Sequence, residues 1–133
     1  NHALFHGHTF TANPTGCAAA LASISLLKNP DIFDNIAKIN ALHLQFEKHI
    51  SQHYKVKTTR VLGVIFALEL QVSEKQDYYS NLRNQFYNFF IEKGVILRPV
   101  GNILYILPSY IISEESLQQI YATIEQALNE IPC

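Results

Sequence analysis

The 133-residue sequence lacks several features, and each absence limits the class of protein to which it can belong. It has no methionine or tryptophan, and its two cysteines, Cys17 and Cys133, fit neither a disulfide framework nor a zinc site. A reducing cytosol is therefore the simplest setting. The net charge is −1 and like charges do not run together, so the chain shows no basic footprint for nucleic acid. Its apolar runs are short and interrupted, which excludes a transmembrane helix.

What is present indicates a folded protein. Hydrophobic residues make up 48% of the chain and charged residues 16%, a balance typical of globular domains with a sizeable core. The length suits one domain, or one small domain plus a piece of another. The chain starts at Asn1 without an initiator methionine or a signal sequence. We therefore expect a longer protein to continue upstream; a processed mature protein is the alternative.

The first 30 residues predict a loop followed by a helix. Asn13 and Pro14 form a helix start, with asparagine as the N-cap and proline in the first helical position. The helix is expected to run to about Lys28, and most of its residues are small enough to let it approach a neighbouring backbone closely. We expect residues 1–30 to belong to another domain, or to a segment between domains.

The remaining residues, 31–133, predict one small α+β domain in the order α-β-β-α-β-β-α. Apolar residues at helical spacing predict three helices, and short apolar runs with turn signals predict two strand pairs. The helices are expected over 32–53, 79–93 and 113–131, the strand pairs over 56–70 and 94–110, and a polar linker over 73–77. Such an order makes a small sheet with helices mainly on one face.

The stretch from His6 to Pro14 is a candidate phosphate site. Gly7 can let the backbone approach a ligand, Thr9 and Thr11 offer hydroxyl groups, and a helix N-terminus follows. The alternative is an ordinary capped loop.

Arg98 is a candidate carboxylate-binding residue. It stands at the expected end of a strand, among apolar neighbours and directly before the rigid Pro99. A guanidinium binds a carboxylate through two parallel hydrogen bonds. The alternative is a surface ion pair at a strand end, and Arg60 and Arg83 have such simpler explanations.

The histidines do not predict a metal site. Those that could supply ligands form two sets, His2, His6 and His8, and His49 and His53. No carboxylate or cysteine accompanies either set at a convincing spacing. His43 falls within an apolar helical stripe, which favours a hydrogen-bonded core histidine. The usual motifs of hydrolases, nucleotide-binding loops and dinucleotide-binding folds are also missing.

Three stretches of the chain, read together, match one family. Residues 6–20 read HGHTFTANPTGCAAA, residues 60–63 and 69–70 read RVLG and EL, and residues 94–112 read GVILRPVGNILYILPSYII. They resemble class III pyridoxal-phosphate aminotransferases, whose usual motifs are H-G-x-T-F-x-G-N-P-x-x-C-A-A-A and R-x-x-G…E-L. The last stretch is the most specific, and it resembles the members of the family that act in biotin biosynthesis.

The resemblance implies a fold and a set of residue roles. Residues 31–133 would be the C-terminal small domain of a fold-type I aminotransferase, and residues 1–30 would belong to its large cofactor domain. Thr9 would reach the phosphate of pyridoxal 5'-phosphate on the neighbouring subunit of a homodimer, with His8 beside it. Arg98 would bind the carboxylate of the oxo-acid substrate, with Gly7 and Tyr105 close to that substrate.

The chain also departs from the family pattern. His8 stands where proline is common, Ala12 where glycine is common, and Ser109 where a second proline is common, but none of these changes removes Thr9. The lysine that holds the cofactor in this family lies upstream, and none of the seven lysines here has that context. We therefore expect this chain alone to be inactive.

For the full-length cytoplasmic protein, the resemblance implies transfer of an amino group from S-adenosylmethionine to 8-amino-7-oxononanoate, giving 7,8-diaminononanoate. The amino donor stays open, because some relatives use lysine. One alternative is a class III aminotransferase for ornithine or acetylornithine, although these usually lack the continuation that contains Tyr105 and Pro108. The other is a non-catalytic α+β binding module.

Overall fold

The structure is a computed structural model that describes residues 7–71 and 81–132. The expected linker at 73–77 lies outside these residues, as do His2 and His6. By its internal contacts the chain divides into two units, Asn1–Phe33 and Asp34–Cys133. Each unit is described by itself. The predicted domain boundary after residue 30, and the assignment of the first residues to a cofactor domain, stay predictions.

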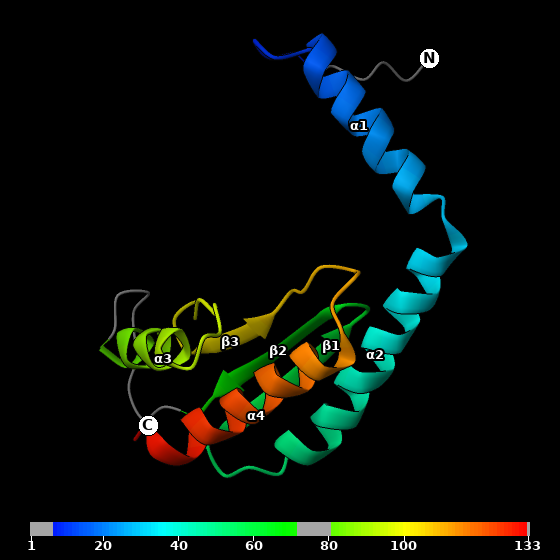
Figure 1. Cartoon of the computed structure of the whole chain (residues 1–133). Helices are drawn as coiled ribbons and strands as arrows, with labels where there is room; N and C mark the ends of the chain where they lie inside the picture. Colours follow the sequence, from blue (N-terminus) through cyan, green and yellow to red (C-terminus); the bar gives the residue numbers. More distant parts are fainter. Residues whose placement is uncertain (1–6, 72–80, 133) are drawn as a thin grey trace, which may run out of the picture. The chain divides into compact units, whose positions relative to one another are not determined.

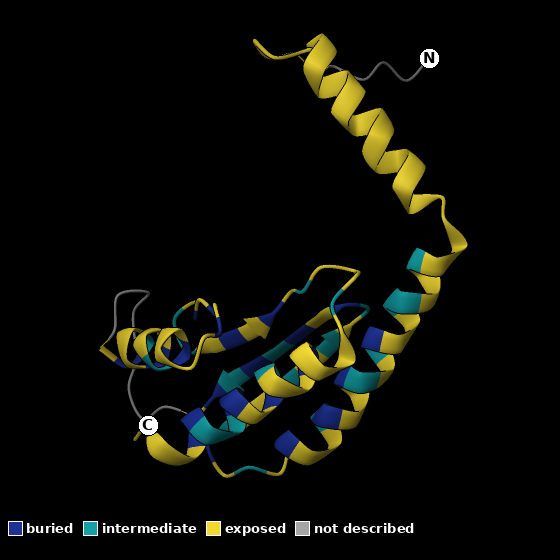
Figure 2. Cartoon of the chain, in the orientation of Figure 1, coloured by how far each residue is buried: buried dark blue, intermediate teal, exposed yellow. Residues whose placement is uncertain are grey.

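The first unit contains helix α1, Pro14–Leu27 (Figure 1). Its predicted start is confirmed, because Asn13 Oδ1 accepts the backbone N–H groups of Thr15 at 3.0 Å and Gly16 at 3.2 Å. No residue of α1 is buried, as its uniform yellow colour in Figure 2 shows. Its side chains therefore contribute nothing to a core within this chain.

The second unit has the predicted α+β composition. Its elements are α2 Pro30–Ile50 (which begins within the first unit), β1 Val56–Leu62, β2 Ile65–Leu70, α3 Asn81–Glu92, β3 Ile103–Ile106 and α4 Glu114–Glu130. The three strands form an antiparallel sheet in the order β1-β2-β3. Gly63, with φ +56°, occupies the turn between β1 and β2, where a glycine at positive φ suits a two-residue hairpin.

The two faces of this sheet differ in burial. One face is covered by α2, α3 and α4 and packs with them in a single core (Figures 1 and 2). The residues of β2 and β3 on this face are almost fully buried, and Val56 and Val61 of β1 are partly buried against the same core; the fully buried ones are Phe66, Leu68, Leu70, Leu104 and Ile106. The alternate residues, such as Arg60 and Tyr105, are exposed. Helices on one face of the sheet are thus confirmed.

One predicted strand is missing. Residues 95–99 alternate between buried and exposed, as an extended chain does, but they form no ladder with another strand of the described residues. Only Val100 bridges Ile103, around the predicted turn at Gly101 and Asn102. Proline has no N–H group to donate to a ladder. Pro99 therefore helps to explain why the prediction of a first strand in this hairpin is wrong.

The core contains a satisfied polar network centred on His43, as predicted. His43 is 0% exposed, and its Nε2 lies 3.0 Å from the Val64 carbonyl oxygen. Because that oxygen can only accept, Nε2 carries the proton, and Nδ1 accepts from the Tyr121 hydroxyl at 2.6 Å. Burial lowers the pKa of His43 and raises that of Tyr121. Both groups are therefore neutral partners within the core.

The end of α4 is tied to the start of the sheet by a buried lysine. Lys55 Nζ donates to the carbonyl oxygens of Leu128 and Ile131, both at 2.7 Å. These carbonyls lie at the C-terminal end of the helix, where a cation is favourable. In the described part of the chain, no helix is both long and apolar enough to cross a membrane.

Candidate substrate and phosphate sites

Arg98 and Tyr105 line the same hollow of the second unit. Arg98 lies in the extended segment 95–99, where Leu97 and Pro99 are buried and Arg98 is exposed. Tyr105 projects from β3 between the buried Leu104 and Ile106. The hollow has a volume of about 340 Å³ and is lined by Ile96, Leu97, Arg98, Tyr105, Ile106, Leu107, Pro108, Ile112 and Ile120. The structure thus places Arg98 and Tyr105 in one hollow, and their roles toward a substrate stay predictions.

The guanidinium of Arg98 is available for a ligand. Within residues 7–71 and 81–132 it makes no hydrogen bond or ion pair, so the alternative of a surface ion pair finds no support there. Its neighbours are apolar, and Ile96 and Leu107 are 83% and 61% exposed. One free cation beside exposed aliphatic side chains suits a ligand that carries a carboxylate on an apolar chain.

Sequence reasoning missed Arg83. Its Nε–H donates to the Pro99 carbonyl oxygen at 3.3 Å, across a separation of 16 residues, and its Nη1 donates to Asn84 Oδ1 at 3.2 Å. The residue is half-buried on α3. The only signal in the sequence was an arginine beside an apolar helical stripe, which does not reveal its partner.

The candidate phosphate loop forms a closed turn. The His8 N–H donates to Thr11 Oγ1, and the Thr11 N–H donates back to the His8 carbonyl, both at 2.9 Å. His8 Nδ1 also accepts the Phe10 N–H at 3.1 Å. Thr9 is exposed at this turn, and its hydroxyl has no hydrogen bond within the described residues. The Thr9 hydroxyl is therefore available to a ligand.

Part of this loop is already hydrogen-bonded within the chain. Thr11 Oγ1 accepts the His8 N–H, which leaves its own O–H able to donate. The first N–H groups of α1 bond to the Asn13 side chain, so those N–H groups are not free for a phosphate. A Cβ added at Gly7 would meet nothing within 4 Å, so space within the chain does not require glycine there, and the role of Gly7 toward a ligand stays a prediction.

Ala12 is the place where the loop departs from ordinary backbone geometry. Its φ is +57°, in the left-handed region, which costs a residue other than glycine roughly 1–2 kcal/mol. This is one of the positions where the sequence departs from the motif that it resembles. Ala12 thus adopts a conformation that glycine takes without this cost.

The candidate residues are divided between the two units. Gly7, His8 and Thr9 lie in the first unit, and Arg98 and Tyr105 lie in the second. The structure therefore groups the loop residues within the first unit and the two residues of the hollow within the second.

The second histidine set has partners other than a metal. His49 Nε2 lies 3.3 Å from a Glu125 carboxylate oxygen, and His53 Nε2 lies 3.4 Å from Asn129 Oδ1. Among the residues that the structure describes, no three histidine, cysteine or acidic side chains are placed to hold a metal ion.

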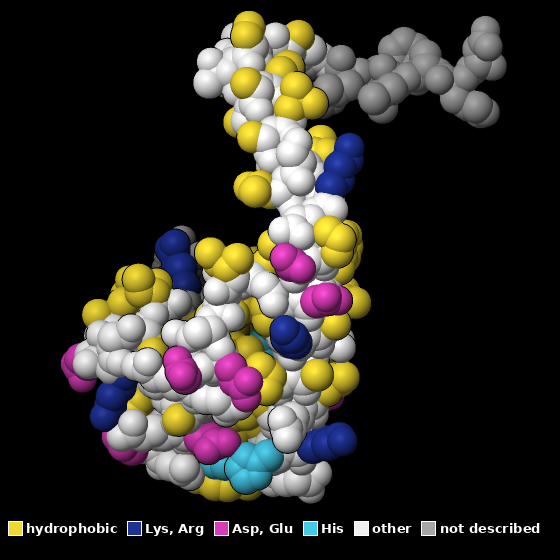
Figure 3. All heavy atoms as spheres, turned by 45° about the vertical axis from the view of Figure 1, so that its right-hand side comes forward, with side chains coloured by type: hydrophobic (Ala, Val, Ile, Leu, Met, Phe, Trp, Pro, Cys, Tyr) yellow, Lys and Arg dark blue, Asp and Glu magenta, His cyan; other side chains and the backbone are white. Residues whose placement is uncertain are grey.

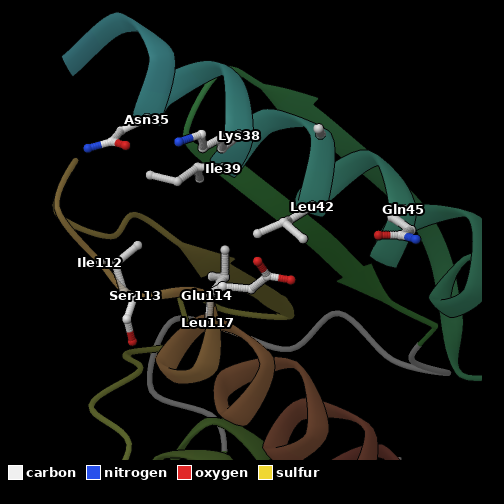
Figure 4. A pocket seen from close by; sticks show the side chains of 10 residues that line it. Asn35, Lys38, Ile39, Leu42, Gln45, Ile112, Ser113, Glu114 and Leu117 are labelled. Atoms are coloured by element: carbon white, nitrogen blue, oxygen red, sulfur yellow. The ribbon is translucent and has the colours of Figure 1, made fainter. Parts of the chain in front are cut away.

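A larger hollow, of about 410 Å³, lies between α2 and the start of α4 and contains none of the candidate residues. Figure 4 shows apolar side chains such as Ile39, Leu42 and Ile112 along it, with Lys38 and Glu114 among its polar side chains. On the face shown in Figure 3, basic, acidic and histidine side chains are interspersed without a basic patch. A larger volume by itself does not indicate a binding site. The hollow at Arg98 is the better candidate, because it combines apolar walls with a guanidinium that is unpaired within the described residues.

Comparison with known proteins gives one family. The family model described as "Aminotransferase class-III" matches residues 1–128. The adenosylmethionine-8-amino-7-oxononanoate aminotransferase of Synechococcus elongatus is 40% identical over 131 residues, which are 98% of this chain and 30% of that protein. The chain thus spans less than a third of that curated relative.

Solved structures show the same likeness. The structure of adenosylmethionine-8-amino-7-oxononanoate aminotransferase from Methanocaldococcus jannaschii matches with a TM-score of 0.83 and 26% identity, over 98% of this chain and 31% of that one. An amine transaminase from an uncultivated Pseudomonas species matches with a TM-score of 0.80 and 27% identity, over the same shares of the two chains. Because this family model matches residues 1–128 of the chain, the chain belongs to the class III aminotransferases.

Proposed function

We propose that this chain is the C-terminal part of a pyridoxal-phosphate-dependent transaminase of biotin biosynthesis. The complete enzyme would move an amino group from S-adenosylmethionine to 8-amino-7-oxononanoate, giving 7,8-diaminononanoate. The names of the curated relatives support this substrate pair. The observation that carries the proposal is the free guanidinium of Arg98, beside Tyr105 in an apolar hollow.

The chemistry of the proposed substrate fits this hollow. 8-Amino-7-oxononanoate has a carboxylate at the end of an aliphatic chain. Arg98 can bind the carboxylate with two parallel N–H donors, and Ile96 and Leu107 offer apolar contacts to the methylene groups. The Tyr105 hydroxyl adds a donor at the same wall. The function of these residues is to bind and orient the oxo-acid.

The first unit would contribute to cofactor binding. Pyridoxal 5'-phosphate, when bound, supplies an electron sink for the transfer. The free Thr9 hydroxyl fits a phosphate oxygen, and His8 holds the turn that presents it. In the family pattern, this threonine serves the cofactor of the neighbouring subunit, so we propose a homodimer. Since the cofactor-holding lysine is not in this chain, the chain alone would be inactive.

The fold does not distinguish among the substrates of class III aminotransferases, because the TM-score of the amine transaminase, 0.80, is close to the 0.83 of the Methanocaldococcus jannaschii enzyme. Another class III aminotransferase is therefore the second candidate. Such an enzyme would not need a carboxylate anchor for a simple amine or ketone.

The experiment compares Arg98→Ala with the wild type in the complete enzyme. Losing a desolvated charge pair typically costs about 2–5 kcal/mol, so we expect kcat/KM for the oxo-acid to fall by roughly 30-fold to several-thousand-fold. Cofactor absorbance should be unchanged, and Lys48→Ala, which removes another cation of the same unit, should leave both readouts unchanged. Equal loss of oxo-acid use and cofactor binding would remove the carboxylate role, and undiminished use of the acid would favour the second candidate.

A further inference from the structure

We propose that Arg83 is a positioning residue for the carboxylate site: its hydrogen bond to Pro99 holds the segment that carries Arg98. The inference rests on the proposed function for its kinetic consequence, but its structural part can be tested without it. Arg83 donates to the backbone next to Arg98 and is not among the residues that line the hollow.

The segment around Arg98 has few other restraints. At its start the Val95 N–H donates to the Phe90 carbonyl at 2.8 Å, and at its end Val100 and Ile103 exchange two hydrogen bonds of 2.9 and 3.0 Å. Between them, at residues 96–99, the Arg83 bond is the one hydrogen bond that the described part of the chain supplies. The segment is therefore fixed at both ends and held at one point between them.

That point controls which side chains face outward. Val95, Leu97 and Pro99 are buried, whereas Ile96 and Arg98 are exposed. In an extended chain, a slip by one residue exchanges the two sets, and such a slip would turn Arg98 toward the core. Pro99 has no N–H group, so its carbonyl is its only backbone hydrogen-bonding group. Arg83 uses that group to keep the segment in register.

Arg83 is well placed for this role because its helix packs against the core. The neighbouring Leu82 is 6% exposed, and Phe86 and Phe90 are fully buried in the core. Nη1 donates to Asn84 Oδ1 at 3.2 Å, which orients the guanidinium so that Nε points at Pro99. A donor on a packed element restrains a neighbouring segment more firmly than a donor on a loop.

The expected consequence is weaker binding of the acid substrate. A displaced Arg98 would bind a substrate carboxylate less well, so the effect should appear in KM and not in the chemical step. The KM for the oxo-acid should therefore rise, while kcat stays the same. A general loss of folding would instead lower the apparent kcat, through the smaller active fraction, and leave the KM unchanged.

The test uses two uncharged variants of the same length in the complete enzyme. Glutamine places an N–H donor the same number of bonds from Cα as the arginine Nε, whereas methionine places a methyl group there. Arg83→Met should raise the KM for the oxo-acid about tenfold, as expected for one lost hydrogen bond. Arg83→Gln should stay within about twofold of the wild type. A rise of equal size in both variants, or in neither, would overturn the inference.

A second measurement is independent of the activity. Amide hydrogen exchange of Val95 and Val100, whose N–H groups are hydrogen-bonded at the two ends of the segment, should speed up in Arg83→Met and not in Arg83→Gln when followed by NMR in the 133-residue chain. Unchanged exchange in Arg83→Met would overturn the positioning role. If exchange responds as expected but Arg98→Ala leaves oxo-acid use intact, the proposed function fails and the structural role of Arg83 stands.

Discussion

Helices α1 and α4 begin alike and are stabilised differently. Each starts with a side chain that accepts backbone N–H groups, Asn13 in α1 and Ser113 in α4. In α4, six residues are buried, and they contribute to the core of the second unit; in α1 none is. A capped helix start therefore shows where a helix begins, but not which contacts stabilise the helix.

The physical reason lies in the cost of ordering a chain. Isolated helices of about this length are marginal in water, and most helical stability in proteins comes from packing an apolar face. Helix α1 has no charged residue, and its Leu21 and Leu26 are 66% and 70% exposed. We therefore interpret α1 as a helix whose stability depends on contacts that the described part of this chain does not make.

The largest expected effect separates a core residue from an exposed one. Phe90→Ala removes a fully buried ring of α3 and should lower the free energy of unfolding by about 3–5 kcal/mol. The matched change Leu26→Ala, in α1, should alter it by less than about 0.5 kcal/mol. Urea unfolding followed by circular dichroism measures both. A comparable loss in the two variants would mean that α1 shares the core.

A smaller effect is expected at the two N-caps. Ser113 Oγ accepts the Ser116 N–H at 3.1 Å, and Ser113→Ala should cost the second unit about 1 kcal/mol. Asn13→Ala removes two such bonds from α1, yet the main unfolding midpoint should not move, because α1 contributes no buried residue. A midpoint shift in Asn13→Ala that matches Ser113→Ala would remove the distinction between the units.

The last expected effect concerns pH and the core of the second unit. Burial lowers the pKa of His43 in the folded state, so below the unfolded pKa of about 6.5 the unfolded chain binds more protons. The stabilising contribution of neutral His43 is thus complete above that pH and declines as the pH falls, by at most about 1.4 kcal/mol per pH unit.

His43→Gln should flatten this decline between about pH 7 and 5, since glutamine does not titrate. His49→Gln is the control, because His49 belongs to the same helix and its side chain is 74% exposed. Chemical denaturation at a series of pH values gives the two slopes. If His43→Gln kept the full wild-type slope, another group would be responsible for the pH dependence.

Much of the second unit could be predicted from local patterns. The spacing of Leu82, Phe86 and Phe90 predicted α3, and the position of His43 in an apolar stripe predicted its burial. These predictions succeeded because each helix shows its buried face within a few turns of sequence. The extra strand before Pro99 could not be excluded in this way, because a strand exists only if a partner pairs with it.

The candidate site likewise has features that the sequence predicted and features that only the structure showed. The sequence alone determined the family, the helix starts and the choice of Thr9, Arg98 and Tyr105 as candidates, because motifs and caps depend on neighbouring residues. Only the tertiary structure placed Arg98 and Tyr105 in one hollow, and only it showed the bond from Arg83 to Pro99. Hydrogen bonds and burial depend on distances in space, and packing of the core sets those distances.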